Sequence, residues 1–409
     1  MKKLKILETS KTLNRGSRFL SAVKNQRLKI LEVTTYTAGV CGVSSRVLQE
    51  ADLLAKHGHE VTIFSTNHVK SRPKEIAPTE ERRGHVIIRR FPAIKLGGES
   101  FTYWRFKREL LLLRPEIIIV HAFRHTHTTR ALHIANKLGI PCVLVTHAPF
   151  NTRNEQRSLL SKLAIFLYDH FIAPITLKQF SKIIAITHWE LPYLHRLGIS
   201  KEKIAYIPNG IPPLFFSQKP SPVSPRKILY FGRISPVKDL ETALHALSLM
   251  KNKSVSLELA GPAEQDYLTK LKSLVASLHI ESRVSFTPAI YNLKKKISKL
   301  DSTHVFILPS KREGMPQSLI EAMSRKKIVI ASDNLGARDL IQNKKNGFLF
   351  PIGNTQALAD TLDKAFSLPV SKAKTIQKAA RASVEQFSWD KVIEKLEALL
   401  KEVTKEGHI

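Results

Sequence analysis

Cysteine is scarce in this 409-residue sequence, because Cys41 and Cys142 are the only two. Two cysteines provide neither a disulfide framework nor a cluster of zinc ligands. No apolar run approaches the ~20 residues that a membrane-spanning helix needs. The N-terminus is basic but lacks the apolar stretch and the small-residue cleavage site of a secretory signal peptide. We therefore expect a cytoplasmic protein.

Acidic residues are also in short supply. The sequence has 34 Asp and Glu against 65 Lys and Arg, which gives a formal net charge of +31. Such an excess suits an anionic substrate, an anionic membrane surface or nucleic acid, and it can also serve solubility alone. Zinc-finger spacing, aromatic RNA-binding motifs and basic zippers are missing. Nucleic acid is therefore the least favoured partner of the three.

The hydrophobic pattern predicts an α/β protein. Short apolar runs alternate with amphipathic helical stretches, which implies parallel sheets covered by helices on both faces. The alternation stops at a proline-rich stretch and then starts again, so we expect two Rossmann-like domains facing across a cleft. The expected strands are 28–34, 59–65, 85–90, 116–121, 141–146, 181–187 and 204–207 in the first half, and 227–231, 255–260, 283–286, 304–308, 328–331 and 347–350 in the second.

The domain boundaries follow from this pattern. Residues 1–27 form a basic N-terminal arm, which is either an interfacial segment or the product of a start codon set too far upstream. Two amphipathic helices, near Lys372–Gln386 and Trp389–Val403, close the chain. The expected divisions are 28–207 for the first domain, 208–226 for the linker, 227–386 for the second domain and 387–409 for the final helix.

Two glutamates flank the end of one predicted strand. Glu313 and Glu321 lie on either side of Gly314 and of a helix start near Pro316, where free N–H groups make an anion site. A glycosidase acid/base pair needs ~5–9.5 Å between its two carboxyl groups, and the turn at Glu313 leaves that distance open. Carboxylates beside an anion site can instead accept hydrogen bonds from a polyol. We favour this second interpretation.

Cations follow the first strand of the second half. Gly232, Arg233 and Lys238 come after the strand that ends at Phe231, at the edge where open α/β sheets bind ligands. A planar guanidinium and a point charge together suit a diphosphate. Gly261 is a second glycine, at the end of the next strand.

The first half offers a glycine turn and two histidines. Gly42 lies between the first strand and a predicted helix, Arg46–His57, in a βαβ unit whose turn faces a ligand. The turn lacks the G-x-G-x-x-G fingerprint and a suitable ribose-binding acid, which disfavours a nicotinamide cofactor. His121 and His147 each end a later predicted strand.

Taken in order, these motifs resemble those of the family 4 retaining glycosyltransferases of the GT-B fold. The second half supplies GRISPVK, PSKREGMPQSLIEA with its E-x7-E spacing, and SDNLGARDLI followed by NGFLF. The first half supplies GVSSRVLQEADLLAKHGHEVTIFST, THAPF, SKIIAIT and IPNGI. The resemblance covers residues 28–403, and the GV-x-S-x-VLQ-x-A pattern is most similar to the bacterial phosphatidylinositol mannosyltransferases.

The resemblance implies a GT-B fold whose first domain binds the acceptor and whose second domain binds a nucleoside-diphosphate (NDP) sugar. The final helix would return to the first domain. Arg233 and Lys238 would hold the diphosphate, Glu321 the ribose and Glu313 the sugar, while either histidine would contact the transferred sugar or be structural. The implied catalytic residues are Arg233, Lys238, Glu313, His121 and His147; the implied donor-binding residues are Gly42, Gly232, Arg233, Lys238, Gly261, Glu313, Gly314, Met315, Leu319 and Glu321.

The family mechanism transfers a hexosyl group with retention, and the leaving phosphate helps to deprotonate the acceptor. The sequence lacks a metal-binding Asp-x-Asp motif, so we expect no metal cofactor. We expect an enzyme of glycan biosynthesis, bound peripherally to the cytoplasmic face of a membrane and acting on a lipid-linked or anionic acceptor. The alternatives are a non-catalytic sugar-nucleotide or polyanion binder on the same fold, and a cytosolic sugar or polysaccharide synthase.

Two features leave questions open. Arg153–Phe180 is apolar, basic and helical, which suits a membrane surface, but such folds ordinarily keep a core helix there, and core packing is the favoured interpretation. Asp239 stands where the family often has Gly or Asn, and Phe286–Pro288 replaces a usual glycine turn near the expected base contact. The nucleobase is therefore not predicted.

Overall fold

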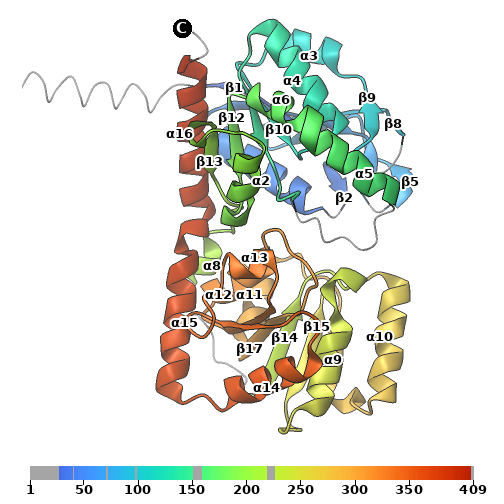
Figure 1. Cartoon of the computed structure of the whole chain (residues 1–409), viewed down its shortest axis with the longest axis vertical. Coiled ribbons are helices and arrows are strands. Elements are labelled where there is room, and N and C mark those ends of the chain that lie inside the picture. The colour runs from blue at the N-terminus through green and yellow to red at the C-terminus, as the bar shows by residue number, and fades with distance from the viewer. Residues whose placement is uncertain are drawn as a thin grey trace, which may run out of the picture.

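The computed structural model describes residues 27–39, 41–70, 72–96, 99–150, 159–218 and 226–406. The predicted basic arm lies outside these ranges, apart from Arg27. Two α/β bodies lie one above the other, and the last two helices run along one side of both (Figure 1). No helix in the described ranges is long and apolar enough to cross a membrane.

The sheet of the N-terminal half has the order β13-β12-β11-β10-β1-β3-β7-β6. All pairs in it are parallel except β6 with β7. Most side chains of its central strands are apolar and buried, as expected of strands that are covered on both faces. The strands are β1 (Lys29–Val33), β3 (Glu60–Thr66), β6 (Glu80–Arg83), β7 (Val86–Phe91), β10 (Ile117–His121), β11 (Cys142–Val145), β12 (Lys182–Ala185) and β13 (Ile204–Tyr206).

The sequence pattern of Phe101–Leu113 predicts a single helix, and this prediction is wrong in its first part. Residues 101–106 do not continue the helix α3, because Thr102–Trp104 forms strand β9, which pairs with β8 (Ala93–Lys95). Trp104 is buried in the core and Tyr103 points outward, which is the alternation of a strand. The helices are α2 (Gly42–Lys56), α3 (Lys107–Leu113), α4 (Thr126–Leu138), α5 (Leu159–Leu167), α6 (Ala173–Lys178) and α7 (Leu191–Arg196), and a small extra sheet contains β2 (Ala38–Gly39), β4 (His68–Lys70) and β5 (Arg72–Ile76).

The C-terminal half contains a parallel six-stranded sheet of order β16-β15-β14-β17-β18-β19. Its strands are β14 (Lys227–Phe231), β15 (Ser256–Ala260), β16 (Val284–Thr287), β17 (Val305–Leu308), β18 (Ile328–Ser332) and β19 (Phe348–Phe350). Its helices are α8 (Leu214–Ser217), α9 (Leu240–Leu249), α10 (Gln265–Ser277), α11 (Leu293–Asp301), α12 (Gln317–Ser324), α13 (Leu335–Arg338), α14 (Thr355–Phe366), α15 (Val370–Val384) and α16 (Trp389–Glu406).

Both sheets reverse their strand order at one point, between β1 and β10 in the first and between β14 and β17 in the second. Ligands of open α/β sheets bind beyond the carboxyl ends of the strands at such a point. The fold therefore places two loop clusters where binding is expected: those after β1 and β10, and those after β14 and β17.

The helix α16 returns to the N-terminal half, as expected for this fold class. Its apolar side shares a core with β1, β3 and α2, through residues such as Leu396 and Val403. The chain crosses tightly, since a Cβ on Gly210 would lie 2.4 Å from the Trp389 ring. The α/β, GT-B-like arrangement of two Rossmann-like domains is thus confirmed.

The segment predicted as one long helix, Arg153–Phe180, is helical where it is described. A π-helical turn, Tyr168–Ile172, joins α5 to α6. Leu177 and Phe180 are buried, as core packing predicts, but Phe166 and Phe171 are exposed. The prediction of core packing is therefore right for Leu177 and Phe180 at the end of the segment and wrong for the exposed side chains of Phe166 and Phe171.

Candidate active site

The loops after β14 and β17 are joined by an ion pair. Nζ of Lys238 lies 2.6 Å from Oε1 of Glu313, and both side chains are largely buried. The backbone fixes this approach, because the N–H of Lys311 donates to the carbonyl of Val237 at 2.9 Å. The sequence interpretation gave Lys238 and Glu313 separate ligand groups. The structure brings them together, so one polar cluster can contact both the phosphate and the sugar of a donor.

Asp239 stands where the family often has Gly or Asn, and its backbone conformation accounts for that preference. It follows Lys238 with φ +52°, a left-handed conformation that Gly and Asn adopt most readily. Its carboxylate accepts a hydrogen bond from Oγ1 of Thr242 at 2.9 Å. This contact ties the turn to the start of α9.

Glycines shape the same edge of the sheet. A Cβ on Gly261 would lie 1.9 Å from the carbonyl oxygen of Gly232, so the two strand ends pack backbone against backbone. A Cβ on Gly336 would lie 2.5 Å from the carbonyl oxygen of Gly314, so α13 supports the loop that carries Glu313. Gly336 was not predicted as a site residue, although it lies in the SDNLGARDLI motif.

Glu321 has a cationic partner that the sequence interpretation missed. Nζ of Lys296, from α11, lies 2.6 Å from Oε1 of Glu321 and 5.1 Å from the centre of the Phe231 ring. Oε2 of Glu321 is buried without a hydrogen-bond partner in the described structure, so it could accept a ligand hydroxyl. Lys296 is one of three consecutive lysines, and nothing in the sequence distinguishes it from its neighbours.

The start of α12 provides backbone donors. Its N-cap, Pro316, makes no side-chain capping bond, and the N–H groups of Gly314 and Met315 have no acceptor in the described chain. The N–H of Leu319 differs, because it donates to the carbonyl of Pro316 at 3.1 Å. Leu319 is fully buried and serves packing, so Gly314 and Met315 remain the candidate donors.

Arg233 is a cation near Lys238 and Glu313 whose side chain stays available for a ligand. It is exposed, and its guanidinium forms no ion pair with any described residue. Its backbone carbonyl accepts the hydroxyl of Tyr230 at 2.6 Å, which orients the turn. Burial, with Arg233 and Lys95 nearby, lowers the pKa of Lys70 in the N-terminal half. Positive charge therefore comes from both halves.

The N-terminal half contributes the start of α2 to this region. Gly42 is its first residue, and the N-cap Cys41 makes no side-chain capping bond, so the first N–H groups are free for an anion. A Cβ on Gly42 would meet nothing within 4 Å. The space beside this glycine is open, as a diphosphate contact would require.

His147 lies on a strained turn that touches the donor loop. His147 and Ala148 have φ of +59° and +54°, and a Cβ on Gly314 would lie 3.1 Å from Cβ of Ala148. The indole of Trp189 donates to the carbonyl of Gly314 at 3.2 Å, and the N–H of Asn209 approaches the sulfur of Met315 at 3.2 Å. The two halves therefore meet where the predicted catalytic groups converge.

Glu190 holds this strained turn in place. Its buried carboxylate accepts the N–H of Ala148 at 2.9 Å and the hydroxyl of Thr146. It also caps its own helix through the N–H of Thr187 at 3.0 Å. The pattern Thr187-x-x-Glu190 is a capping-box motif, a signal from which the helix start could have been predicted.

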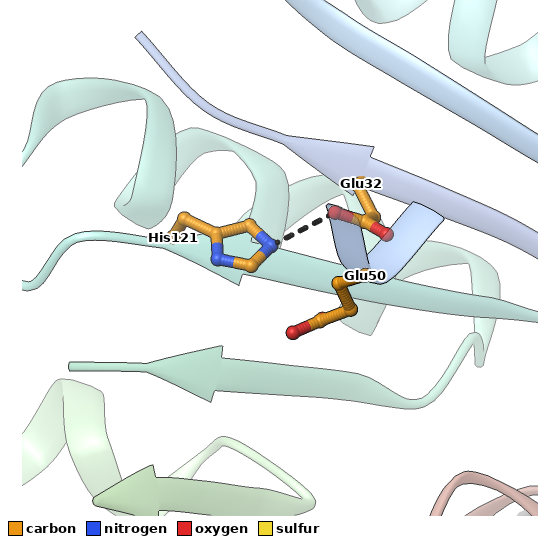
Figure 2. A group of neighbouring side chains, drawn as sticks. All are labelled: Glu32, Glu50 and His121. Carbon is orange, nitrogen blue, oxygen red and sulfur yellow. Dashed lines mark ion pairs between the residues drawn. The ribbon is translucent and has the colours of Figure 1, made fainter. Parts of the chain in front are cut away.

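His121 lies behind His147. Its side chain is fully buried, its Nδ1 is 3.1 Å from Nε2 of His147, and its Nε2 is 3.2 Å from Oε2 of Glu32 (Figure 2). Burial, with neighbouring charges, lowers the pKa of both histidines well below the ordinary value. Of the two predicted histidines, only His147 is partly exposed and able to reach a ligand.

Glu32, Glu50 and His121 are also close enough to hold a metal ion, because their ligand atoms lie within 4.8 Å of one another. However, a cation already occupies this space. Nε of the fully buried Arg46 donates to Oε2 of Glu50 at 2.9 Å. With the guanidinium of Arg46 beside Glu50, the group is a buried ion-pair cluster in this structure.

The two-domain fold and the matching family models identify a glycosyltransferase. Two family models match consecutive parts of the chain: "Glycosyltransferase Family 4" at residues 40–213 and "Glycosyl transferases group 1" at residues 213–383. The chain belongs to family 4 of the glycosyltransferases, with the GT-B fold.

Curated relatives agree with this assignment. An uncharacterized glycosyltransferase of Haemophilus influenzae is 26% identical over 370 residues, which cover 88% of this chain and 97% of the relative. The amylovoran biosynthesis glycosyltransferase AmsK of Erwinia amylovora is 29% identical over 230 residues, which cover 54% of this chain. The chain spans only about half the length of AmsK, 53%.

Solved structures share the fold. The sucrose-phosphate synthase of Thermosynechococcus elongatus aligns with a TM-score of 0.73 at 19% identity, covering 93% of this chain and 100% of that one. Anabaena HepE in complex with UDP and glucose aligns with a TM-score of 0.69 at 19% identity, covering 92% of this chain and 100% of that one. At such identities the likeness establishes the fold alone.

Proposed function

We propose that this glycosyltransferase moves a hexosyl group from an NDP-sugar to an acceptor with retention of configuration and without a metal cofactor. The observation that carries the proposal is the convergence of Lys238, Glu313 and Arg233, which has no ion-pair partner among the described residues, beside the strained turn of His147. A diphosphate needs cations, and a sugar needs carboxylate and imidazole acceptors or donors. The UDP and glucose bound by HepE support a nucleotide-sugar donor.

The roles of the residues follow from their positions. Arg233 and Lys238 would bind the diphosphate and stabilise the charge that develops on it as the bond from the anomeric carbon to the phosphate oxygen breaks. That phosphate oxygen takes the proton of the acceptor hydroxyl as the new bond to the anomeric carbon forms. Glu313 would hold sugar hydroxyls, His147 would contact the sugar from the other half, and Glu321 would hold the ribose.

A thermal-shift screen of UDP-, GDP- and ADP-sugars tests the donor, because a ligand that binds the folded state raises its melting temperature. We expect one nucleotide class to stabilise the protein and the Lys238→Ala variant to lose that shift. Lys270→Ala is the matched control, because Lys270 lies on α10 with its side chain 68% exposed, paired with Glu241. Equal shifts in wild type and Lys238→Ala would refute the assignment.

The acceptor part of the proposal rests on an exposed apolar surface. We propose that the α5–α6 face binds an anionic membrane surface and so brings a lipid-linked acceptor to the site. Six large apolar side chains there are between 45% and 66% exposed, and exposed lysines flank them at Lys162 and Lys178. Those six side chains are Leu163, Phe166, Leu167, Phe171, Ile172 and Ile175.

Flotation with vesicles tests this face. The wild type is expected to float with phosphatidylglycerol vesicles at moderate salt and not with phosphatidylcholine vesicles. The double variant Phe166→Ser/Phe171→Ser should stay at the bottom. Leu249→Ser removes an apolar side chain that is 50% exposed on α9 of the other half, so this control should float like wild type. Flotation of the double variant would refute the membrane assignment.

A further inference from the structure

We propose that Glu32 and His121 form an internal hydrogen-bond relay that fixes which ring nitrogen of His147 carries the proton. Both act as positioning residues, and His147 is the group that reaches the ligand. The inference rests on the proposed function, in which His147 contacts the transferred sugar. It adds a role for a carboxylate that the glycosyltransfer chemistry itself leaves unused.

The geometry gives the His121 ring one contact with the Glu32 carboxyl group and another with the His147 ring. Nε2 of His121 lies 3.2 Å from Oε2 of Glu32, and Nδ1 of His121 lies 3.1 Å from Nε2 of His147 (Figure 2 shows the first pair). The contact of His121 with His147 has the geometry of a hydrogen bond. The contact of His121 with Glu32 is at ion-pair distance, but its orientation falls short of a hydrogen bond in this structure, so the relay requires a small rotation of the Glu32 carboxyl group. Glu32 and His121 come from the adjacent strands β1 and β10, where Glu32 pairs with Ile119.

The side chains of Glu32 and His121 are buried, so their polar groups need partners inside the protein. The side chains of Glu32 and His121 are 0% exposed. The two carboxyl oxygens of Glu32 have no conventional hydrogen-bond partner within the described ranges. A buried polar group without a partner costs free energy, so a charged strand residue in this position calls for a function. His121 and Glu50 are the close neighbours that can share a proton with it, and His121 is the one that also contacts His147.

Neighbouring groups explain why the relay does not simply form an ion pair. Arg46 donates through Nε to Glu50 at 2.9 Å and through Nη1 to Oδ1 of Asn209 at 3.0 Å, whereas its Nη2 has no hydrogen-bond partner within the described residues. The ring Nε2 of His127 approaches the backbone carbonyl of His121 at 2.9 Å, so it does not compete for the His121 ring. Among the described residues, the ion-pair contact of Glu32 is with His121.

The relay has two internally consistent proton patterns. When Glu32 is protonated, its O–H donates to Nε2 of His121, Nδ1–H of His121 donates to Nε2 of His147, and the proton of His147 sits on Nδ1. When Glu32 is ionised, each shared proton lies one step farther from Glu32: Nε2–H of His121 donates to the carboxylate, Nε2–H of His147 donates to Nδ1 of His121, and Nδ1 of His147 carries only a lone pair. The two patterns differ by one proton, which enters or leaves at Nδ1 of His147.

Burial favours the first pattern. It raises the pKa of Glu32 well above its ordinary value, with Glu50 adding to the effect, and it lowers the pKa of both histidines. Neutral Glu32 and neutral imidazoles then leave Nδ1–H of His147 as a donor. This nitrogen has no protein acceptor in the part of the chain that the structure describes. A donor in that place suits a sugar hydroxyl oxygen or a phosphate oxygen.

Two substitutions of His121 separate positioning from packing. The amide of His121→Asn can donate to Nε2 of His147 in place of Nδ1–H, whereas His121→Leu fills the space but donates nothing. We expect His121→Leu to lower kcat by about tenfold to a hundredfold, as loss of one well-placed hydrogen bond does. His121→Asn should retain most of kcat. Equal losses in both variants would overturn the relay.

Nitrogen NMR of wild type keeps the test independent of those variants. With ¹⁵N-labelled histidine, and the His147 signal assigned by its absence in His147→Gln, we expect the proton on Nδ1 at neutral pH. Glu32→Gln should preserve this tautomer, because its amide also donates to His121. A proton on Nε2 of His147 in wild type would refute the relay. Donor-induced stabilisation should remain in the His121 and Glu32 variants, and its absence in wild type would instead refute the proposed function.

Discussion

Lys238 and Glu313 lie 75 positions apart in the chain, yet their Nζ and Oε1 atoms are 2.6 Å apart. The fold produces this contact because β14 and β17 are neighbours at the point where the strand order reverses. In the protein without ligand, each group compensates the charge of the other. A bound donor would share the pair, with its phosphate drawing on the lysine and its hydroxyls on the carboxylate.

The first prediction concerns this pair. Lys238→Met and Glu313→Gln should each lower kcat/KM by about a hundredfold, the effect of removing one preorganised electrostatic contact. Because the two groups act as a unit, the double variant should be little worse than either single variant. Steady-state kinetics on all four proteins measures the coupling, and additive losses would mean that the two residues act separately.

The second prediction concerns Lys296. Its ammonium group holds Glu321 at 2.6 Å, so Lys296→Ala leaves a buried carboxylate without a cation. We expect a KM for the donor that is about tenfold higher, with kcat nearly unchanged, because the ribose lies away from the reacting bond. Lys299→Ala is a matched control on the same helix, since Lys299 pairs with Glu258 instead. A fall in kcat at constant KM would contradict the ribose role.

The third prediction concerns the backbone contact of Gly261. Gly261→Ala forces a Cβ to within 1.9 Å of the Gly232 carbonyl oxygen, so we expect a loss of about 3–5 kcal/mol in the free energy of unfolding. Gly353→Ala is the control, because Gly353 also has a positive φ, +72°, but nothing within 4 Å. It should cost about 1–2 kcal/mol, the conformational strain alone. Equal costs by urea denaturation would contradict the predicted clash.

The fourth prediction concerns the docking of α16. Burial alone would raise the pKa of Glu397, but hydrogen bonds with Lys401 and His57 outweigh it and lower the pKa to about 2. The folded-state pKa of Glu397 lies below the ordinary value of 4.5, so its contribution to stability is complete above pH 4.5 and is lost as the pH falls toward 2.

Glu397→Gln checks this sign. The variant should lose about 2 kcal/mol of stability at pH 7, and the difference from wild type should shrink as unfolding is measured at successively lower pH below 4.5. Glu402→Gln is the control on the same helix. Its effect should be smaller, since the Glu402 side chain is 52% exposed and pairs with Lys182. A difference between Glu397→Gln and wild type that stays constant from pH 7 to pH 3 would contradict the assignment.

Much of the fold could be predicted from the sequence, because strands buried on both faces are continuous apolar runs. The run EIIIVH gave β10, and the glycine turn after β1 gave the start of α2. The hairpin of β8 and β9 was missed, since its strands are three residues each and Phe101–Leu113 reads as one helix. A short strand leaves too few positions for alternation to outweigh a helical pattern.

The residues of the site could be predicted better than the contacts between them. Strand order places Arg233, Lys238 and Glu313 at one edge, and this follows from the alternation of strands and helices. That Lys238 pairs with Glu313, and Lys296 with Glu321, depends on side-chain packing between distant elements. Glu32 was the overlooked signal, because a carboxylate inside an otherwise apolar strand needs a buried partner.

The central claim is that the chain transfers a sugar from a nucleotide donor at the Lys238–Glu313 site. The most direct measurement incubates wild type and the Lys238→Met/Glu313→Gln variant with radiolabelled UDP-, GDP- and ADP-hexoses and a bacterial lipid and glycan extract. The account predicts that wild type moves label from one nucleotide class into an extracted product, while the double variant does not. Consumption of no donor by wild type, or equal transfer by both proteins, would contradict it.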